Sequence, residues 1–163
     1  MLQTLGYEIS EEALRAGLLH TAWKGRFTVI HKKPLFIVDG AHNAGAADKM
    51  AESIRHYFNG KKLIYIMGVF ADKEYKIVLE KTAHFAEKIY TIETPDNPRA
   101  LPAEELAKAA RVYNSSAEST KSIKDAVEKA FSCAGDDENS VILAFGSLSF
   151  IGALTDAVEE YVG

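Results

Sequence analysis

The chain has 163 residues, of which 47% are hydrophobic and 26% charged, proportions typical of one soluble globular domain. The net charge of −4, with no Lys/Arg run longer than two residues, argues against a surface built to hold nucleic acid. No apolar run is long enough for a membrane span, and residues 1–8 lack the charged and apolar regions of a signal peptide. We therefore expect a cytoplasmic protein that binds neither nucleic acid nor membrane.

Hydrophobic periodicity and capping residues predict secondary structure along the whole chain. In chain order, the predicted elements are a helix at Ser10–Leu19, strands at Phe27–Ile30 and Leu35–Val38, a helix at Ala44–Phe58, a strand at Leu63–Met67, a helix from Asp72 to about Ala86, a strand at Lys88–Ile92, a helix from Pro102, a weaker strand at Arg111–Asn114, a helix at Ser119–Cys133, a strand at Val141–Phe145, and a helix from Ser147 to about Tyr161.

The alternation of strands and helices predicts an α/β fold. Its sheet of about six strands should be mostly parallel, doubly wound and Rossmann-like, with helices on both faces. The first two strands are joined only by His31–Pro34. That connection is too short for a parallel crossover, so we expect the first strand to run antiparallel.

The loops that follow the predicted strands combine Gly or Pro with specific polar residues, and most lead into a helix N-terminus. They are Asp39–Asn43, Gly68–Lys73, Thr94–Arg99 and Gly146-Ser147. In open α/β sheets, ligands bind at this edge, and the backbone N–H groups of a helix N-terminus favour an anion. The run Gly40–Gly45 lacks the Lys-Ser/Thr of a phosphate loop, and no G-x-G-x-x-G fingerprint occurs.

Asp39, His42 and Asn43 each have two interpretations when taken alone. Asp39 either accepts hydrogen bonds from a sugar or caps the following helix. His42 and Asn43 are either ligand contacts or structural and capping groups. Asp39 and His42 together fall short of a metal site, because two candidate ligands do not make one, so no metal is assigned to this chain.

Arg26, Lys73 and Ser147 also have two interpretations each when taken alone. Arg26 precedes the first strand and is either a phosphate clamp or a surface residue. Lys73 lies in an Asp-Lys-Glu cluster, which is solvated in most proteins but can also bind an anion. Ser147 is an N-cap that could equally bind a carboxylate.

Taken together, Gly25-Arg26-Phe27 and Asp39-Gly40-Ala41-His42-Asn43 resemble the C-terminal domain of folylpolyglutamate synthase and of the bifunctional dihydrofolate synthase/folylpolyglutamate synthase, within the Mur ligase superfamily. Further matches are Gly68 with Asp72-Lys73, Asn97–Ala100 and Gly146–Leu148. Two departures are Glu74, where the family pattern has Asp, and Phe145–Ser149, where many members begin with Thr and end with Tyr.

The resemblance implies an ATP-dependent, ADP-forming ligase that joins L-glutamate to folate, and in some members also makes dihydrofolate from dihydropteroate, through an acyl phosphate. Residues 1–22 would be the tail of a missing N-terminal ATPase domain with its linker, and residues 23–163 the Mur ligase C-terminal domain. That ATPase domain would carry the phosphate loop and the Mg²⁺ ligands. We expect this chain alone to be inactive, and the parent enzyme to be a monomer.

The resemblance also assigns roles to six residues. Arg26, Asp39 and His42 would bind ATP, with His42 also a candidate catalytic residue, and Asn43, Lys73 and Ser147 would bind glutamate. Two other functions stay open. One is the C-terminal domain of another Mur-type amino-acid ligase of cell-wall synthesis, and the other is a stand-alone nucleotide- or amino-acid-binding module.

Overall fold

A computed structural model describes residues 3–21, 23 and 25–163. Its strands are β1 (Thr28–Lys32), β2 (Leu35–Val38), β3 (Lys62–Met67), β4 (Lys88–Thr91), β5 (Ala117–Ser119) and β6 (Ser140–Phe145). Its α-helices are α1 (Glu11–His20), α2 (Ala44–Tyr57), α3 (Tyr75–Thr82), α4 (Ala103–Arg111), α5 (Ile123–Ala134) and α6 (Ile151–Val162). Short 3₁₀ turns lie at Gln3–Leu5, Ala83–Phe85 and Leu148–Phe150.

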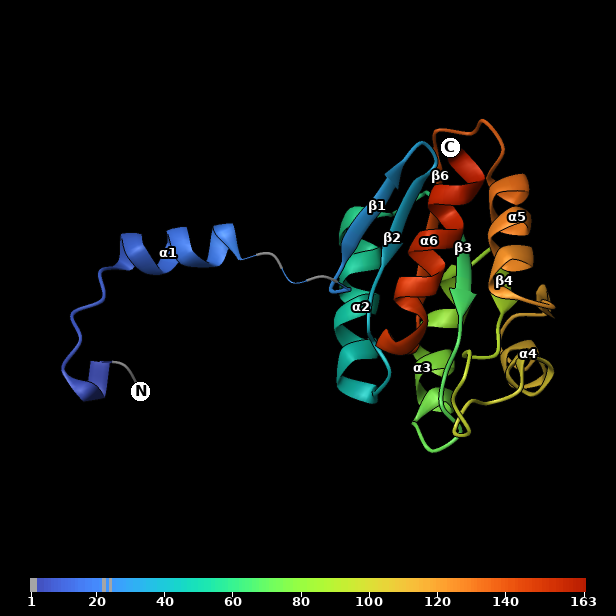
Figure 1. The fold of residues 1–163 in the computed structure, drawn as a ribbon, viewed down its shortest axis with the longest axis horizontal. Helices are drawn as coiled ribbons and strands as arrows, with labels where there is room; N and C mark the ends of the chain where they lie inside the picture. Colours follow the sequence, from blue (N-terminus) through green and yellow to red (C-terminus); the bar gives the residue numbers. More distant parts are fainter. Residues whose placement is uncertain (1–2, 22, 24) are drawn as a thin grey trace.

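The strands form a six-stranded sheet in the order β1-β2-β6-β3-β4-β5 (Figure 1). β1 pairs antiparallel with β2, and every other pairing in the sheet is parallel. The antiparallel first strand predicted from the four-residue connection is confirmed. β6 and β3 pair along their whole lengths at the centre of the sheet, and every residue of β6 is buried, as expected of a parallel strand covered on both faces.

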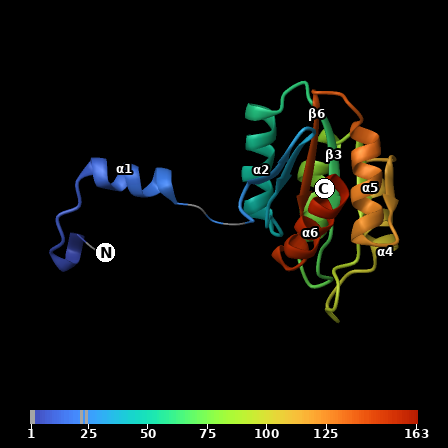
Figure 2. The same ribbon diagram turned by 45° about the horizontal axis from the view of Figure 1, so that its top comes forward.

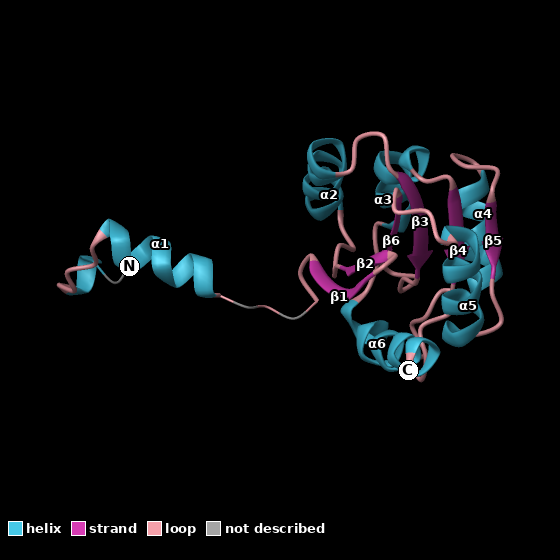
Figure 3. Ribbon diagram, turned by 90° about the horizontal axis from the view of Figure 1, so that it is seen from above, coloured by secondary structure: helices cyan, strands magenta, loops and turns pink. Residues whose placement is uncertain are grey.

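Helices cover both faces of the sheet, as predicted. One core lies under α2, α3 and α4, and includes Met50, Val78 and Leu106. The other lies under α5 and α6, and includes Val127 and Leu154. Figure 3 shows the sheet between α2 and α3 on one side and α6 on the other. The loops therefore lie at the two ends of the strands. We call the end where the parallel strands finish the carboxyl edge of the sheet, and the end where they begin the opposite edge.

The predicted strand at Arg111–Asn114 is wrong. α4 continues to Arg111, and the sixth strand is β5, at Ala117–Ser119. The apolar side chains of Val112 and Tyr113, which suggested a strand, are 76% and 40% exposed. The Asn114 side chain donates hydrogen bonds to the carbonyls of Ala83 and Ala86 at 3.0 and 2.6 Å. The segment is therefore a connector fixed by a polar side chain.

Helix boundaries also differ from the prediction. α5 begins at Ile123 because Ser122 caps it, accepting a hydrogen bond from the Asp125 N–H, while Ser119 ends β5. The helix predicted from Asp72 begins at Tyr75. The predicted helix after Ser147 starts with a 3₁₀ turn before α6.

The N-terminal helix α1 is set apart from the sheet in both Figures 1 and 2. Ser10 caps it, as expected, by accepting a hydrogen bond from the Ala13 N–H at 3.1 Å. None of its residues is buried. The domain boundary expected at residue 22 lies outside the described residues, so it stays a prediction. No helix in the described ranges is long and apolar enough to cross a membrane.

Candidate functional site

The carboxyl ends of β3 and β6 approach each other closely enough to require glycine. Gly146, directly after β6, has φ +117, and a Cβ there would lie 2.4 Å from the carbonyl oxygen of Gly68. A Cβ on Gly68, directly after β3, would lie 2.8 Å from Cγ1 of Ile92. Both distances are shorter than real Cβ atoms show, so larger residues would push the strand ends apart. The glycines thus bring two loops together at this edge.

A cavity of about 260 Å³ opens where these loops meet. It is lined by His42, Phe70, Lys73, Gly146, Ser147, Leu148 and Ser149. Three of the six predicted site residues, His42, Lys73 and Ser147, therefore share one cavity although three different strands precede them. Convergence of a few polar groups in a concave site is a feature of small-molecule binding sites.

His42 has a defined orientation in this cavity. Its Nδ1 lies 2.6 Å from the carbonyl oxygen of Gly40. Because a carbonyl only accepts, Nδ1 carries the hydrogen of this bond, and in the neutral ring Nε2 keeps a free lone pair. The residue is half-buried. It can therefore accept a proton from a group bound in the cavity.

Ser147 is 5% exposed. Its Oγ accepts a hydrogen bond from the Ser149 N–H at 3.2 Å and lies 2.7 Å from the Ser149 Oγ. The two hydroxyls can rotate together, so one of them can donate to an acceptor in the cavity. Sequence reasoning identified Ser147 but missed Ser149.

Lys73 contributes a positive charge to the lining of this cavity. Its ammonium lies 3.9 Å from Oδ2 of Asp72, and its side chain is 36% exposed. The Arg99 guanidinium donates to both oxygens of Asp72, at 2.5 and 3.3 Å, and holds the pKa of that carboxyl below its ordinary value. A compact ammonium on a flexible stem suits a carboxylate ligand.

Asp39 joins the start of β1 to the loop after β2. One carboxylate oxygen accepts the Phe27 N–H at 2.9 Å, and the other accepts the Ala41 N–H at 2.7 Å. The first bond holds Phe27 at φ +45, a conformation that L-residues rarely adopt. Asp39 is thus a structural hydrogen-bond acceptor here, and each oxygen retains a further lone pair.

Arg26 lies beside the same loop without lining the cavity. A Cβ on Gly40 would be 3.4 Å from its Nη1, which places the guanidinium next to Gly40. Arg26 is exposed and forms no ion pair with any residue in the described part of the chain. It is therefore available to an anion that approaches this edge from outside.

Asn43 caps α2, where its Oδ1 accepts the Ala46 N–H at 2.9 Å. It does not line the cavity, so its predicted contact with glutamate stays a prediction. Phe70 lines the cavity and was not predicted as a site residue. An aromatic residue in a loop otherwise rich in Gly and charge was the only hint in the sequence.

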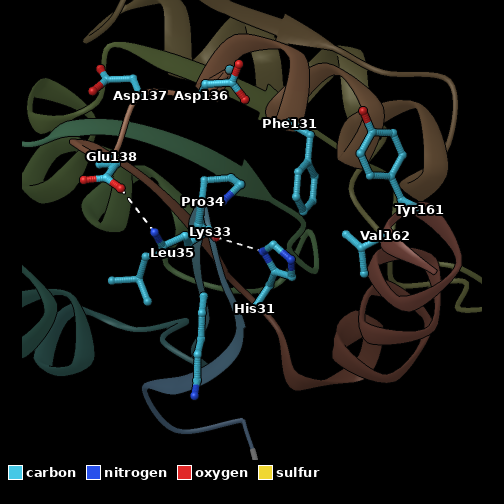
Figure 4. Close-up of a pocket in the computed structure, with 12 residues that line it drawn as sticks. His31, Lys33, Pro34, Leu35, Phe131, Asp136, Asp137, Glu138, Tyr161 and Val162 are labelled. Atoms are coloured by element: carbon cyan, nitrogen blue, oxygen red, sulfur yellow. Dashed lines mark hydrogen bonds and ion pairs between the residues drawn. The ribbon is translucent and has the colours of Figure 1, made fainter.

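Two larger cavities lie elsewhere. One of about 750 Å³ is formed at the opposite edge of the sheet by the β1–β2 turn, the α5–β6 loop and the end of α6, and includes His31, Phe131 and Tyr161 (Figure 4). Another of about 840 Å³ lies between the loop after β4, α5 and α6. None of the predicted site residues lines either cavity.

The described residues contain no group of three or more His, Cys, Asp or Glu side chains that could hold a metal ion. The chemistry that these loops can support is recognition of carboxylates and phosphates, together with acceptance of one proton at His42.

Residues 25–148 match the family model described as Mur ligase, glutamate ligase domain. The chain belongs to this family. It is also 32% identical over 143 residues to the dihydrofolate synthase/folylpolyglutamate synthase of Bacillus subtilis, which covers 88% of this chain and 32% of that protein. The resemblance found in the sequence is thereby confirmed.

Solved structures agree in fold. A bifunctional folylpolyglutamate synthase/dihydrofolate synthase with Mn, AMPPNP and L-glutamate bound is 25% identical, with a TM-score of 0.82 over 97% of this chain and 37% of that one. The folylpolyglutamate synthase of Thermotoga maritima is 27% identical, with a TM-score of 0.73 over 97% of this chain and 36% of that one. The chain thus spans about a third of the length of the relatives it matches.

Proposed function

We propose that this chain is the glutamate-ligase part of an ATP-dependent, ADP-forming ligase that adds L-glutamate to a folate. The observation that carries the proposal is the shared cavity of Lys73, Ser147 and His42 at the carboxyl edge of the sheet. The names of the relatives, several of which are folylpolyglutamate synthases, support glutamate as that amino acid.

In this proposal, Lys73 binds a carboxylate of the incoming glutamate through its ammonium, and a hydroxyl of the Ser147–Ser149 pair donates to a carboxylate oxygen. The α-amine of glutamate attacks the carbonyl carbon of an acyl phosphate, so that a C–N bond forms and the C–O bond to phosphate breaks. His42 Nε2 takes the proton that the amine releases. Asn43 follows His42 in the same loop, and it would contact glutamate when the ATPase domain closes over the site.

The nucleotide would come from a second domain. Arg26 has the planar geometry to donate two hydrogen bonds to ATP phosphates across a cleft. Asp39 would accept from the ribose through its remaining lone pairs while it holds the Phe27 turn. The phosphate loop and the Mg²⁺ ligands belong to the ATPase domain that we expect to precede residue 23. We further propose that the parent enzyme is cytoplasmic and monomeric.

Joining the chain to an ATPase domain of the same family tests this function. The purified chain, incubated with Mg-ATP, L-glutamate and either dihydropteroate or a reduced folate, should release no ADP above background. The joined protein should release ADP only when glutamate and an acceptor are both present. Turnover by the chain alone, or a joined protein that accepts a cell-wall amino acid and rejects glutamate, would contradict the proposal.

A further inference from the structure

The loop before α3 is hydrogen-bonded through its backbone to the loop before α4. Phe70 and Ala100 form an isolated antiparallel bridge. The Ala71 N–H donates to the Arg99 carbonyl at 2.8 Å, and the Leu101 N–H donates to the Val69 carbonyl at 3.0 Å. The backbone of residue 99 is therefore fixed against the loop that carries Lys73.

The Arg99 side chain extends this contact to the cavity wall. Its guanidinium lies 4.9 Å from the centre of the Phe70 ring, which lines the cavity. Its Nη2 and Nε donate to the two oxygens of Asp72 at 2.5 and 3.3 Å. A two-pronged Arg–carboxylate pair of this kind is stronger and more directional than a single Lys–carboxylate contact.

Asp72 has two cations within reach. Besides Arg99, the ammonium of Lys73 lies 3.9 Å from Asp72 Oδ2, which is beyond hydrogen-bond length. Both carboxylate oxygens are already engaged by Arg99, so Lys73 gains little by turning toward Asp72. Without Arg99, the Asp72 carboxylate would be free to pair directly with the Lys73 ammonium and would compete with any ligand.

We propose that Arg99 is a positioning residue for Lys73. By occupying the carboxylate of Asp72, it leaves the Lys73 ammonium free to bind the carboxylate of an amino-acid substrate. The substrate part of this inference rests on the proposed function. The effect on Lys73 does not, and can be measured without turnover.

The first experiment measures Lys73 directly in the 163-residue chain. An amine-acylating N-hydroxysuccinimide ester is applied near pH 8, and acylation of Lys73 is followed by mass spectrometry, with the exposed Lys32 as internal reference. In Arg99→Gln, Lys73 should react several-fold more slowly, because pairing with Asp72 holds its proton. In Arg99→Gln/Asp72→Asn, the parental rate should return. Equal Lys73 rates in all variants would overturn the inference.

The second experiment is a double-mutant cycle on KM and kcat in the joined ligase. Arg99→Gln should raise KM for glutamate by about tenfold, equivalent to about 1.4 kcal/mol, with kcat changed less than about twofold. Asp72→Asn alone should change KM less than about twofold, and the double variant should recover most of the loss. Arg99→Lys, which keeps the charge without the two-pronged geometry, should lie between parent and Arg99→Gln.

The two experiments separate the possible failures. If Asp72→Asn is as damaging as Arg99→Gln and the double variant is no better, the pair is only a structural clamp and the inference is wrong. If the acylation rates follow the expected cycle while KM for glutamate does not move, Arg99 positions Lys73 but Lys73 does not bind glutamate. That result would contradict the proposed function and leave the positioning role standing.

Discussion

The two edges of the sheet differ in what their cavities are made of. At the carboxyl edge, a cavity of about 260 Å³ is lined by groups that backbone contacts hold in place, such as His42 on the Gly40 carbonyl. At the opposite edge, a groove of about 750 Å³ is lined by surface turns, and Lys33 pairs with Glu138 although both side chains are 83% exposed. Both edges hold a histidine fixed by a backbone carbonyl, since His31 Nδ1 lies 3.0 Å from the Pro34 carbonyl oxygen. The carboxyl edge differs in bringing a histidine, a lysine and a buried serine from three separate loops into one cavity.

The difference follows from the topology. Each parallel strand runs toward the carboxyl edge, where its loop enters a helix N-terminus whose free N–H groups orient polar side chains. The opposite edge receives helix C-termini, and its connections are solvated turns such as Asn59–Lys61 and Gly135–Asn139. An exposed ion pair such as Lys33–Glu138 contributes at most about 1 kcal/mol to stability. It therefore fixes the two side chains at this groove only weakly.

The largest difference between the edges should appear when a glycine is replaced at each. Gly146→Ala forces a Cβ to within 2.4 Å of a carbonyl oxygen at φ +117, and should cost more than about 3 kcal/mol of unfolding free energy. Gly60→Ala, in a turn at the opposite edge with φ +76 and open space around it, should cost about 1–2 kcal/mol. Urea unfolding of the chain measures both, and equal losses would show that the carboxyl edge is not tightly packed.

Arg26 provides the next largest effect. In the joined ligase, Arg26→Lys keeps the charge but loses the two-pronged contact with phosphate, which is worth about 1.5–3 kcal/mol. We expect kcat/KM for ATP to fall about ten- to hundredfold. Lys33→Arg, the matched exchange at the opposite edge, should leave it unchanged. Parental kinetics in Arg26→Lys would show that Arg26 is a surface residue with no role in ATP binding.

Asp39→Asn tests how far the carboxyl edge depends on one side chain. The carboxylate accepts two backbone N–H groups, and an amide keeps only one acceptor oxygen for them. The chain should still fold and should lose about 1–2 kcal/mol of stability. In the joined ligase, kcat/KM for ATP should fall as well. An unchanged unfolding midpoint would mean that the Phe27 turn does not need Asp39.

The sequence predicts the sheet well because its signals are local. Apolar runs, the capping residues Ser10 and Asn43, and the short His31–Pro34 connection determine elements and strand direction without tertiary information. The strand β5 was missed because it has three residues and only one of them, Ala117, is apolar and buried. Its place depends on pairing with β4, which no local pattern encodes.

The candidate site was predictable in part for the same reason. Loop position identifies His42, Lys73 and Ser147, because the carboxyl ends of parallel strands converge. Phe70 was missed, and Arg99 was given no role although it lies in the matched Asn97–Ala100 segment, because their contacts join two loops that are distant in sequence. The structural engagement of Asp39 by two N–H groups could not be read from the sequence either, since its partners lie on two segments.

The smallest effect concerns a charged cluster formed by β4, β5 and α5. Glu118 accepts hydrogen bonds from Lys88 at 2.5 Å and Lys129 at 3.1 Å, which hold its pKa below the ordinary value. Its stabilisation is therefore present above the unfolded-state pKa of about 4.3 and is lost as pH falls through the lower folded-state value. Glu118→Gln should lower stability by less than about 1 kcal/mol at pH 7, and the difference should vanish in acid. A constant difference across pH would contradict this assignment.

The most direct test of the account compares the two edges within one enzyme. In the joined ligase, Lys73→Ala removes the cation of the small cavity, and His31→Ala removes a wall of the large groove. We expect KM for glutamate to rise at least about tenfold in Lys73→Ala, through loss of about 1.5–3 kcal/mol of charge-assisted binding, and to stay parental in His31→Ala. A parental KM in Lys73→Ala, or a comparable rise in His31→Ala, would contradict the placement of the glutamate site at the carboxyl edge.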